Sequence, residues 1–420
     1  MTHARLARRL GTFDAVVIGL GSMIGAGVFS AFAPAAAAAG RGLLIGLALA
    51  AIVAFGNAIS SAQLAARYPT SGGTYVYGRE RLGPWWGFLA GWGFVIGKTA
   101  SCAAMALTVA AYAAPGSGLL QRGLAILAVV ALTAVNLRGI TRTAGVARWL
   151  VAGSLVALAT VVSAILGSGQ ADMGNLAVAL PPAGPYGVLQ AAGLLFFAFA
   201  GYARIATLGE EVRDPARTIP RAIPLALGIT VVVYAAVGAA ALGALGSGAL
   251  AAASAPLASA VAAVGAAWAE PVVRAGAVVA SLGSLLALIA GVGRTALAMA
   301  REGDLPSTLG AVEPRHNVPR HAELAVAAVV IVLVALVDLR GAIGFSSFGV
   351  LTYYAIANAA ALTLAPEERR WPRFISAVGL VGCVTLVATL PLEAVVAGIA
   401  VFAIGVLIRV IRIRQSVPVS

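Results

Sequence analysis

The fold is decided by residues 19–29, which read GLGSMIGAGVF. Each of the four glycines weakens a helix by up to about 1 kcal/mol. The apolar run around them begins near Thr12, so Gly21 to Gly25 would lie about 13–20 Å along a helix, close to the middle of a membrane. We therefore predict a helix that is interrupted at membrane depth.

An interruption there has two interpretations. Unwound backbone inside a membrane is tolerated only where protein buries it or where it lines a watery cavity, and amides freed at the start of a half-helix can bind a carboxylate. Alternatively, Gly21 and Gly25 form a small-xxx-small face for helix packing. The motif by itself leaves both interpretations open. A Rossmann interpretation would need a strand, a turn and a helix, which this segment does not supply.

The composition indicates a polytopic membrane protein of the all-α class. The 420 residues are 61% hydrophobic and 10% charged, with a mean hydropathy of +0.98, whereas soluble domains carry about 25% charged residues. The net charge of +13 comes from loops between apolar runs and not from a basic domain, which excludes nucleic acid as a partner. We expect a single transmembrane domain over residues 1–420, in contact with the lipid bilayer.

Twelve apolar segments are long enough to be considered as spans. They cover residues 13–38, 41–66, 84–113, 122–137, 145–167, 187–209, 221–246, 273–299, 322–337, 341–364, 374–390 and 392–411. With the N-terminus placed in the cytoplasm, most arginines fall on the inner side, as the positive-inside rule requires. We expect a bacterial inner-membrane protein with both termini in the cytoplasm, and an outer loop with a short helix over 247–270.

A second interruption is predicted in the sixth segment. Residues 196–207 read FFAFAGYARIAT, with Gly201 and the polar side chains Tyr202, Arg204 and Thr207 at membrane depth. Interrupted spans at corresponding places in two halves of a chain indicate a transport site built from inverted repeats. The pairing of the two interruptions favours a binding site over a packing face.

These motifs resemble those of the amino acid–polyamine–organocation (APC) permeases. GSMIGAGVF (21–29) is similar to the first-span motif of that superfamily, and FFAFAGYARIATLGEEVRDPARTIPRAI (196–223) is similar to its sixth-span motif. RYPTSGGTYVYGRERLG (67–83) and GRTALAMAREGDLPSTLGAVEPRHNVP (293–319) resemble the loops after the second and eighth spans. The resemblance implies a LeuT-type fold of five plus five inverted repeats (12–167 and 187–364) with two additional helices (374–411), twelve transmembrane helices, and spans 1 and 6 broken.

The resemblance also implies a small-molecule substrate, an amino acid, moved by alternating access. The backbone of the first span would bind its carboxylate at Ser22, Met23, Ile24, Gly25, Ala26 and Gly27. Carbonyls of the sixth span would take its amino group at Phe197, Ala198 and Ala200. Phe199 and Tyr202 are the candidate gating aromatics, although both side chains could equally be apolar packing. No cofactor and no metal site are expected.

The chain departs from its relatives in the residues for ion coupling. Some proton-coupled relatives carry a lysine in the fifth span, where this chain has Ser154. Ser281 and Ser284 lie on the eighth span, whose hydroxyls serve a sodium ion in some members of the fold, although such residues are more often packing. Sodium is therefore less favoured than a proton as the coupling ion.

Two cations within spans need an explanation. Lys98 lies roughly 21 Å along the third span, where a charge is a functional candidate by default; it could carry the coupling proton or be a structural lysine bonded to carbonyls. Arg204 could clamp a carboxylate or pair at an inner gate with Glu210 or Glu211. If both cations face the cavity without an acidic partner, an anionic substrate is favoured over a cationic one.

The function expected from the sequence is secondary transport of amino acids, either proton-coupled or by exchange. Transport of other small organic amines or carboxylates is the alternative, and a non-transporting membrane sensor is a third possibility. An enzyme would need clustered catalytic side chains at membrane depth, whereas His3, His316 and His321 all fall in loops. We therefore do not expect an enzyme.

Overall fold

The computed structural model describes residues 10–69, 72–116, 118–139, 144–177, 184–206, 208, 211–313, 315–316 and 318–416. These ranges are almost entirely helical and contain no β-strand, only isolated bridges between Leu10 and Val212 and between Glu313 and Val318. The chain is therefore an all-α protein over its described residues.

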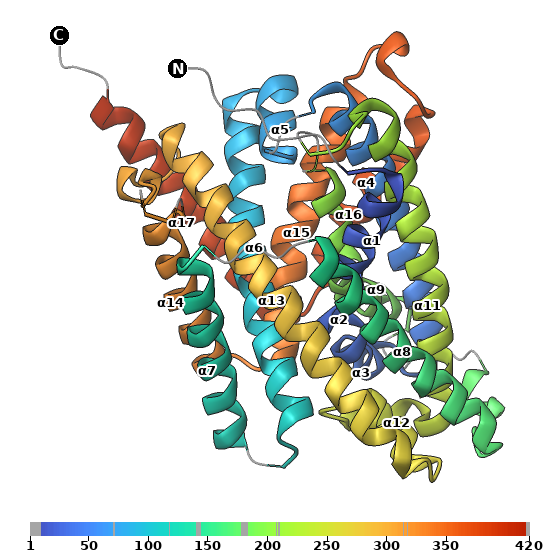
Figure 1. Cartoon of the computed structure of the whole chain (residues 1–420). Coiled ribbons are helices and arrows are strands. Elements are labelled where there is room, and N and C mark those ends of the chain that lie inside the picture. The colour runs from blue at the N-terminus through green and yellow to red at the C-terminus, as the bar shows by residue number, and fades with distance from the viewer. Residues whose placement is uncertain are drawn as a thin grey trace.

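The helices follow one another along the chain with short connections (Figure 1). The α-helices are α1 (Thr12–Met23), α2 (Ala26–Ser30), α3 (Phe32–Ala39), α4 (Leu43–Arg67), α5 (Thr74–Leu82), α6 (Pro84–Ala113), α7 (Gly118–Leu137), α8 (Ala144–Ser168), α9 (Gly184–Phe199), α10 (Ala203–Ala206), α11 (Pro215–Ala252), α12 (Pro256–Ala263), α13 (Glu270–Arg301), α14 (Arg320–Leu336), α15 (Leu339–Leu362), α16 (Arg373–Thr389) and α17 (Leu392–Ser416). The 3-10 turns are η1 (Gly40–Gly42), η2 (Met173–Leu176), η3 (Ala200–Tyr202), η4 (Ala267–Ala269), η5 (Ser307–Gly310) and η6 (Pro366–Glu368).

Ten helical stretches in the described ranges are long and apolar enough to cross a membrane. Counted in this way, α1 and α2 form one stretch, and so do α9 to α10. Helices α14 and α16 have 17 residues each, below the roughly 20 that a perpendicular span needs. The chain is thus a multi-pass membrane protein, and the count of twelve spans stays a prediction.

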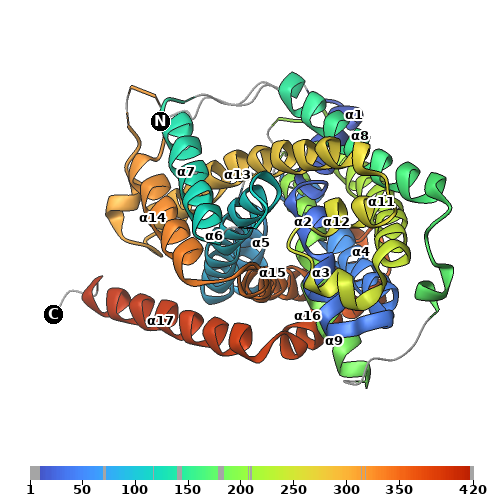
Figure 2. The same cartoon turned by 90° about the horizontal axis from the view of Figure 1, so that it is seen from below.

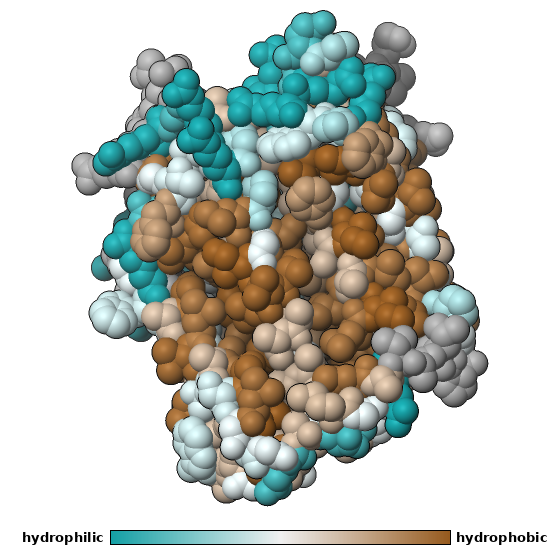
Figure 3. All heavy atoms as spheres, turned by 90° about the vertical axis from the view of Figure 1, so that its right-hand side faces the viewer, coloured by the Kyte–Doolittle hydropathy of each residue, from teal (hydrophilic) through white to brown (hydrophobic). Residues whose placement is uncertain are grey.

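The surface carries the pattern expected of a bilayer protein. On the face drawn in Figure 3, a broad belt of apolar residues separates hydrophilic regions at the two ends. Large apolar side chains are exposed on the outer helices, such as Val232 of α11 at 69% and Val381 of α16 at 65%. Because water would not tolerate so much exposed apolar surface, lipid is the medium that the belt fits.

Glycines allow the central helices to approach one another closely. A Cβ at Gly349 of α15 would lie 2.7 Å from the carbonyl oxygen of Gly93 of α6, and one at Gly97 would lie 3.0 Å from that of Ser346. Small residues let membrane helices pack backbone to backbone in this way. Helices α6, α9 and α15 therefore form the inside of the bundle, while α17 runs along its edge (Figure 2).

Helix starts follow the local sequence. Pro84 opens α6 directly after Gly83, whose φ of 102° suits only glycine. The Asp338 carboxylate caps α15 by accepting the N–H of Gly341 at 2.7 Å. Helix α12 falls in the stretch 247–270, where the sequence predicts a short helix, and lies at the opposite end of the molecule from α5 (Figure 1).

Candidate functional site

The first apolar segment changes direction at Ile24 and Gly25. Helix α1 ends at Met23 and α2 begins at Ala26, and between them Ile24 has φ −79° and ψ 62° while Gly25 has φ −117° and ψ −144°. The N–H of Gly25 donates to the carbonyl of Met23 at 2.8 Å in place of a helical partner. All five residues from Met23 to Gly27 are buried, so this irregular backbone is enclosed by protein.

Neighbouring helices leave no room for a side chain at this point. A Cβ added to Gly25 would lie 2.3 Å from the hydroxyl oxygen of Ser284 on α13. A Cβ added to Gly27 would lie 2.6 Å from the Cα of Ala198 on α9. Contacts below 3.0 Å require something to shift, so the glycines are needed for close approach. The side chain of Ser22 is satisfied locally, because its hydroxyl donates to the carbonyl of Ile18 at 2.9 Å.

The sixth segment changes helix type instead of unwinding. Helix α9 ends at Phe199, η3 forms a single 3-10 turn, and α10 follows from Ala203, with helical dihedral angles at both flanking residues. Gly201 sits in this turn against the first segment: a Cβ there would lie 2.2 Å from the carbonyl oxygen of Ser22 and 2.6 Å from the nitrogen of Met23. The 3-10 turn therefore touches the backbone at the end of α1, directly before the irregular residues Ile24 and Gly25.

One tyrosine joins the two segments at this crossing. The hydroxyl of Tyr234 on α11 lies 2.6 Å from the carbonyl oxygen of Met23 and 3.0 Å from that of Ala198. Its ring packs against Phe199, with centroids 5.0 Å apart. Tyr234 is 1% exposed, so these hydrogen bonds form away from water, where leaving a carbonyl unpaired would be costly.

The carbonyl of Ala200 accepts from two further helices. The ammonium of Lys98 on α6 donates to it at 3.2 Å, and the hydroxyl of Tyr354 on α15 lies 3.4 Å away. The rings of Tyr354 and Tyr202 are 4.9 Å apart. Two of the sixth-segment carbonyls that the resemblance implies for a substrate amino group, those of Ala198 and Ala200, thus already accept from protein donors, while Phe197 is buried in the same helix.

The serines considered for ion coupling occupy different surroundings. Ser154 on α8 is 3% exposed, and its hydroxyl donates to the carbonyl of Leu150 within its own helix at 2.8 Å. Ser281 is fully buried, and its hydroxyl has no hydrogen-bond partner among the described residues. Ser284 faces Gly25, as described above. The structure therefore brings Ser284 to the first-segment turn.

An ion pair and a backbone bridge lie beyond the sixth-segment turn. A guanidinium nitrogen of Arg204 lies 3.9 Å from a carboxylate oxygen of Glu211, and both side chains are partly exposed. The N–H of Leu10 donates to the carbonyl of Glu211 at 3.1 Å, which ties the start of α1 to this segment. Glu210 lies outside the described residues. Of the two candidate partners of Arg204, Glu211 is the one that the structure places beside it.

Near the end of α6, Tyr112 contacts three other elements. Its hydroxyl donates to the carbonyl of Phe29 in α2 at 2.7 Å and accepts the N–H of Leu257 in α12 at 3.2 Å. Its carbonyl accepts from Arg274 of α13 at 3.1 Å, and Arg274 pairs with Glu270 at 2.7 Å. The crossing of the two segments therefore lies between polar contacts on both sides.

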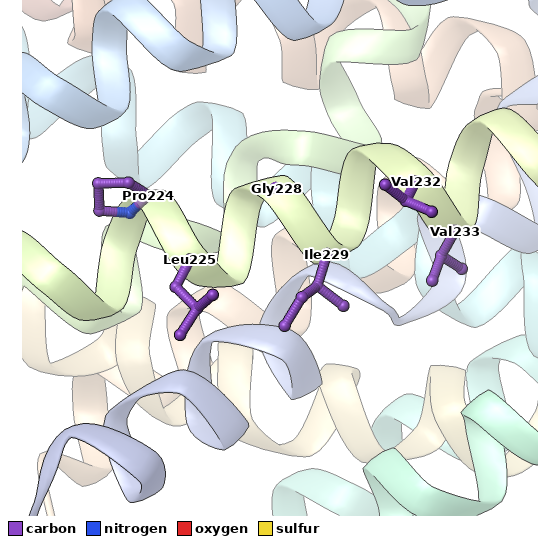
Figure 4. A pocket seen from close by; sticks show the side chains of 6 residues that line it. All are labelled: Pro224, Leu225, Gly228, Ile229, Val232 and Val233. Carbon is purple, nitrogen blue, oxygen red and sulfur yellow. The ribbon is translucent and has the colours of Figure 1, made fainter.

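A groove on the outer face of α11 is unlike this site. It has a volume of about 430 Å³ and is lined by Pro224, Leu225, Gly228, Ile229, Val232 and Val233. Leu225 and Ile229 point to the same side of the helix (Figure 4). With apolar lining and half-exposed side chains such as Leu225, the groove suits a lipid chain and not a polar solute.

Comparison with known protein families identifies the family of this chain. A family model described as "Amino acid permease" matches residues 10–417, nearly the whole sequence. The chain belongs to the amino acid permease family, within the APC superfamily. Membership makes this permease a transporter and not an enzyme, and it implies a small-molecule substrate.

The relatives of this permease differ in what their names say they carry. An uncharacterised transporter of Mycobacterium tuberculosis is 64% identical over 401 residues, covering 96% of this chain and 90% of that protein. A branched-chain amino acid permease of Bacillus subtilis is 26% identical, with 89% and 84% covered. A methylthioribose transporter of the same species is also 26% identical, with 86% and 82% covered.

Sequence reasoning missed two residues of this site. Tyr234 lies within the long apolar helix α11, Tyr354 directly follows Tyr353 in α15, and both hydroxyls bind carbonyls from segments far away in the sequence. A buried tyrosine hydroxyl needs a hydrogen-bond partner, so tyrosines at mid-span were the available signal. The identity of their partners follows only from the three-dimensional packing.

Proposed function

We propose that this permease is a secondary transporter of amino acids that works by alternating access. The observation that carries the proposal is the backbone contact of Gly201 with Ser22 and Met23. There, the last two residues of α1, which directly precede the irregular backbone at Ile24 and Gly25, meet the 3-10 turn η3. Irregular backbone at membrane depth marks the solute site in transporters built from inverted repeats.

The proposed architecture is the LeuT-type arrangement of two five-helix repeats, residues 12–167 and 187–364, followed by two additional helices over 374–411. Spans 1 and 6 would be the broken spans of twelve. This arrangement is supported by family membership and by the turns at Gly25 and Gly201. The permease would sit in a bacterial inner membrane, with both termini in the cytoplasm, as the distribution of arginines favours.

The proposed solute site is formed by the backbone of both segments. Its members from the first segment are Ser22, Met23, Ile24, Gly25, Ala26 and Gly27; those from the sixth are Phe197, Ala198, Phe199, Ala200 and Tyr202. Phe199 and Tyr202 would open and close the site, and the Arg204–Glu211 pair would act at the inner gate. Burial of the two aromatic rings and the 3.9 Å separation of the ion pair support these roles.

Coupling to a proton, or solute exchange, is the proposed driving mode. Lys98 is the candidate proton carrier, because it is a buried amine that donates to a carbonyl of the site. It would replace the fifth-span lysine of some proton-coupled relatives, where this chain has Ser154, whose hydroxyl cannot carry the proton. The titratable groups beside Lys98 are Cys102 of its own helix and Tyr354, which shares its carbonyl. Sodium at Ser281 and Ser284 is the less favoured coupling ion.

One comparison favours a second candidate function, the transport of other small organic solutes. The methylthioribose transporter covers 86% of this chain at an identity close to that of the amino acid permease. A non-transporting sensor is the remaining alternative, and detectable transport excludes it.

Transport into proteoliposomes tests the proposal. The purified permease is reconstituted with internal amino acid mixtures, and uptake of labelled amino acids is measured with and without a pH gradient. We expect saturable counterflow for at least one amino acid in the wild type. Absence of counterflow for every amino acid, with a positive signal for another organic solute, would give the function to the second candidate.

A further inference from the structure

Lys98 is the only lysine in the chain and lies deep inside the bundle. Its side chain is on α6, and the residue is 8% exposed. An ammonium group has three N–H donors. One of them reaches the carbonyl of Ala200 at 3.2 Å. No ion pair joins this ammonium to a carboxylate within the part of the chain that the structure describes.

Among the described residues Arg409 is the other buried cation, and it is paired. Arg409 of α17 is 6% exposed, and its guanidinium lies 3.2 Å from the carboxylate of Asp304, which also accepts from Tyr75. Arg204, beside the same sixth-segment turn, has Glu211. A buried charge is strongly disfavoured without a counter-charge. Lys98 is therefore the buried cation whose counter-charge the described residues do not provide.

The carbonyls around Lys98 leave little capacity for a second cation. Ala200 accepts from Lys98 and Tyr354, Met23 accepts from the N–H of Gly25, and the single O–H of Tyr234 is shared between the carbonyls of Met23 and Ala198. A carbonyl oxygen has two lone pairs. A solute ammonium would have to displace one of these protein donors, and unless the solute carries a net negative charge it would leave the charge of Lys98 uncompensated.

We propose that the solute site takes an anion of net negative charge whose carboxylate pairs with Lys98. The inference rests on the proposed function and narrows its substrate class. A zwitterion would leave the charge of Lys98 uncompensated, whereas an anion cancels it and occupies its two remaining donors. Two sources supply this chemistry: an acidic amino acid, and a carboxylate that has no amino group.

Binding and counterflow by the full-length reconstituted permease test the inference. The probes are L-glutamate, 2-oxoglutarate, L-leucine and L-arginine, with thermal stabilisation of the wild type as the binding measurement and proteoliposome counterflow as the transport measurement. Lys98→Met removes the charge at similar length, and Lys98→Arg keeps the charge. Monodispersity and unliganded melting temperature identify any variant that fails to fold, and the wild-type measurements do not depend on the variants.

We expect L-glutamate or 2-oxoglutarate to stabilise the wild type and to exchange at least tenfold faster than L-arginine. Lys98→Met would lose this preference by tenfold or more, and Lys98→Arg would retain part of it. L-glutamate alone would identify the acidic amino acid, and 2-oxoglutarate the carboxylate without an amine. Exchange of L-leucine or L-arginine in preference to both anions would overturn the anion inference and leave the proposed function standing. Failure of all four probes would overturn the anion inference, and the proposed function would fall only if every other amino acid also failed to exchange.

Discussion

Gly201 of η3 and Ser22 of α1 touch through their backbones: a Cβ on Gly201 would lie 2.2 Å from the carbonyl oxygen of Ser22 and 2.3 Å from its carbonyl carbon. Backbone atoms of a buried segment cannot swing aside as a flexible side chain can. The contact therefore fixes how closely the first and sixth segments cross. When one segment moves relative to the other, its backbone must pass along Gly201.

Gly201→Ala is expected to reduce counterflow at least tenfold, because the methyl group forces the two segments apart. Overpacking of this kind costs about 1–3 kcal/mol, so the protein should still fold, with a lowered melting temperature. The matched control is Gly228→Ala on α11, where an added Cβ meets nothing within 4 Å. Equal transport by the two variants would show that the crossing has no part in transport.

Gly25→Leu is expected to abolish transport in a permease that still inserts and folds. Even a Cβ at this position meets the Ser284 hydroxyl at 2.3 Å, so the longer side chain must displace α13 or fill the turn. Counterflow and size-exclusion profiles of the detergent-purified variant are the measurements. Full activity of Gly25→Leu would remove the first segment from the solute site.

Tyr234→Phe is expected to lower both melting temperature and transport, since it removes the hydroxyl between Met23 and Ala198 and leaves buried carbonyls short of a donor. Such a loss costs about 1–3 kcal/mol. Tyr186→Phe, at a residue that is 49% exposed, is the control for loss of a hydroxyl. A Tyr234→Phe protein as stable and as active as the control would contradict the linking role of Tyr234.

Lys98→Ala is expected to lose accumulation driven by a pH gradient, and any exchange that remains should no longer favour the anions over L-arginine. The reason for the difference between the two modes is that exchange needs no net proton movement, whereas accumulation does. Uptake is measured in two sets of proteoliposomes, one whose interior has the same pH as the outside and one whose interior has a higher pH. An unchanged response to the gradient in Lys98→Ala would end the assignment of coupling to Lys98.

Acid should weaken the ion pairs that Glu368 forms with Arg67 and Arg81. The backbone N–H of Ala365, with help from Arg81 and Arg67, lowers the pKa of Glu368 below its ordinary value. A carboxyl group whose pKa is lowered by folding adds stability above its unfolded-state pKa, and that stability is lost as pH falls through the folded-state pKa.

The melting temperature of Glu368→Gln should therefore be lower than that of the wild type at pH 7, and the difference in melting temperature should shrink toward pH 4. Melting curves of both proteins across this range are the measurement. A difference that is constant with pH would mean that the charge of Glu368 does not contribute.

The site could be predicted from the sequence where the signal is local, and not where it depends on partners. The glycine run predicted an interruption near Gly25, Gly201 predicted a second interruption, and depth along an apolar run singled out Lys98. The sequence could not distinguish an unwound segment from a 3-10 turn at Gly201, because glycine permits both. Nor could it pair Lys98 with the carbonyl of Ala200, because every residue offers such a carbonyl and packing alone selects one.

The fold, like the site, could be predicted from the sequence only where the signal is local. Apolar runs predicted a helical membrane protein, and family membership confirmed its class. Composition alone does not fix the number of spans, since α14 and α16 are near the minimum length and their crossing depends on tilt and on neighbours.

A structure of the permease with a transported solute bound tests the central claim most directly, because it locates the solute without relying on activity. We predict density for the solute against the backbone of residues 24–26, within contact distance of Lys98. Density confined to another place, such as the groove on α11, at a solute concentration that saturates transport would contradict the account.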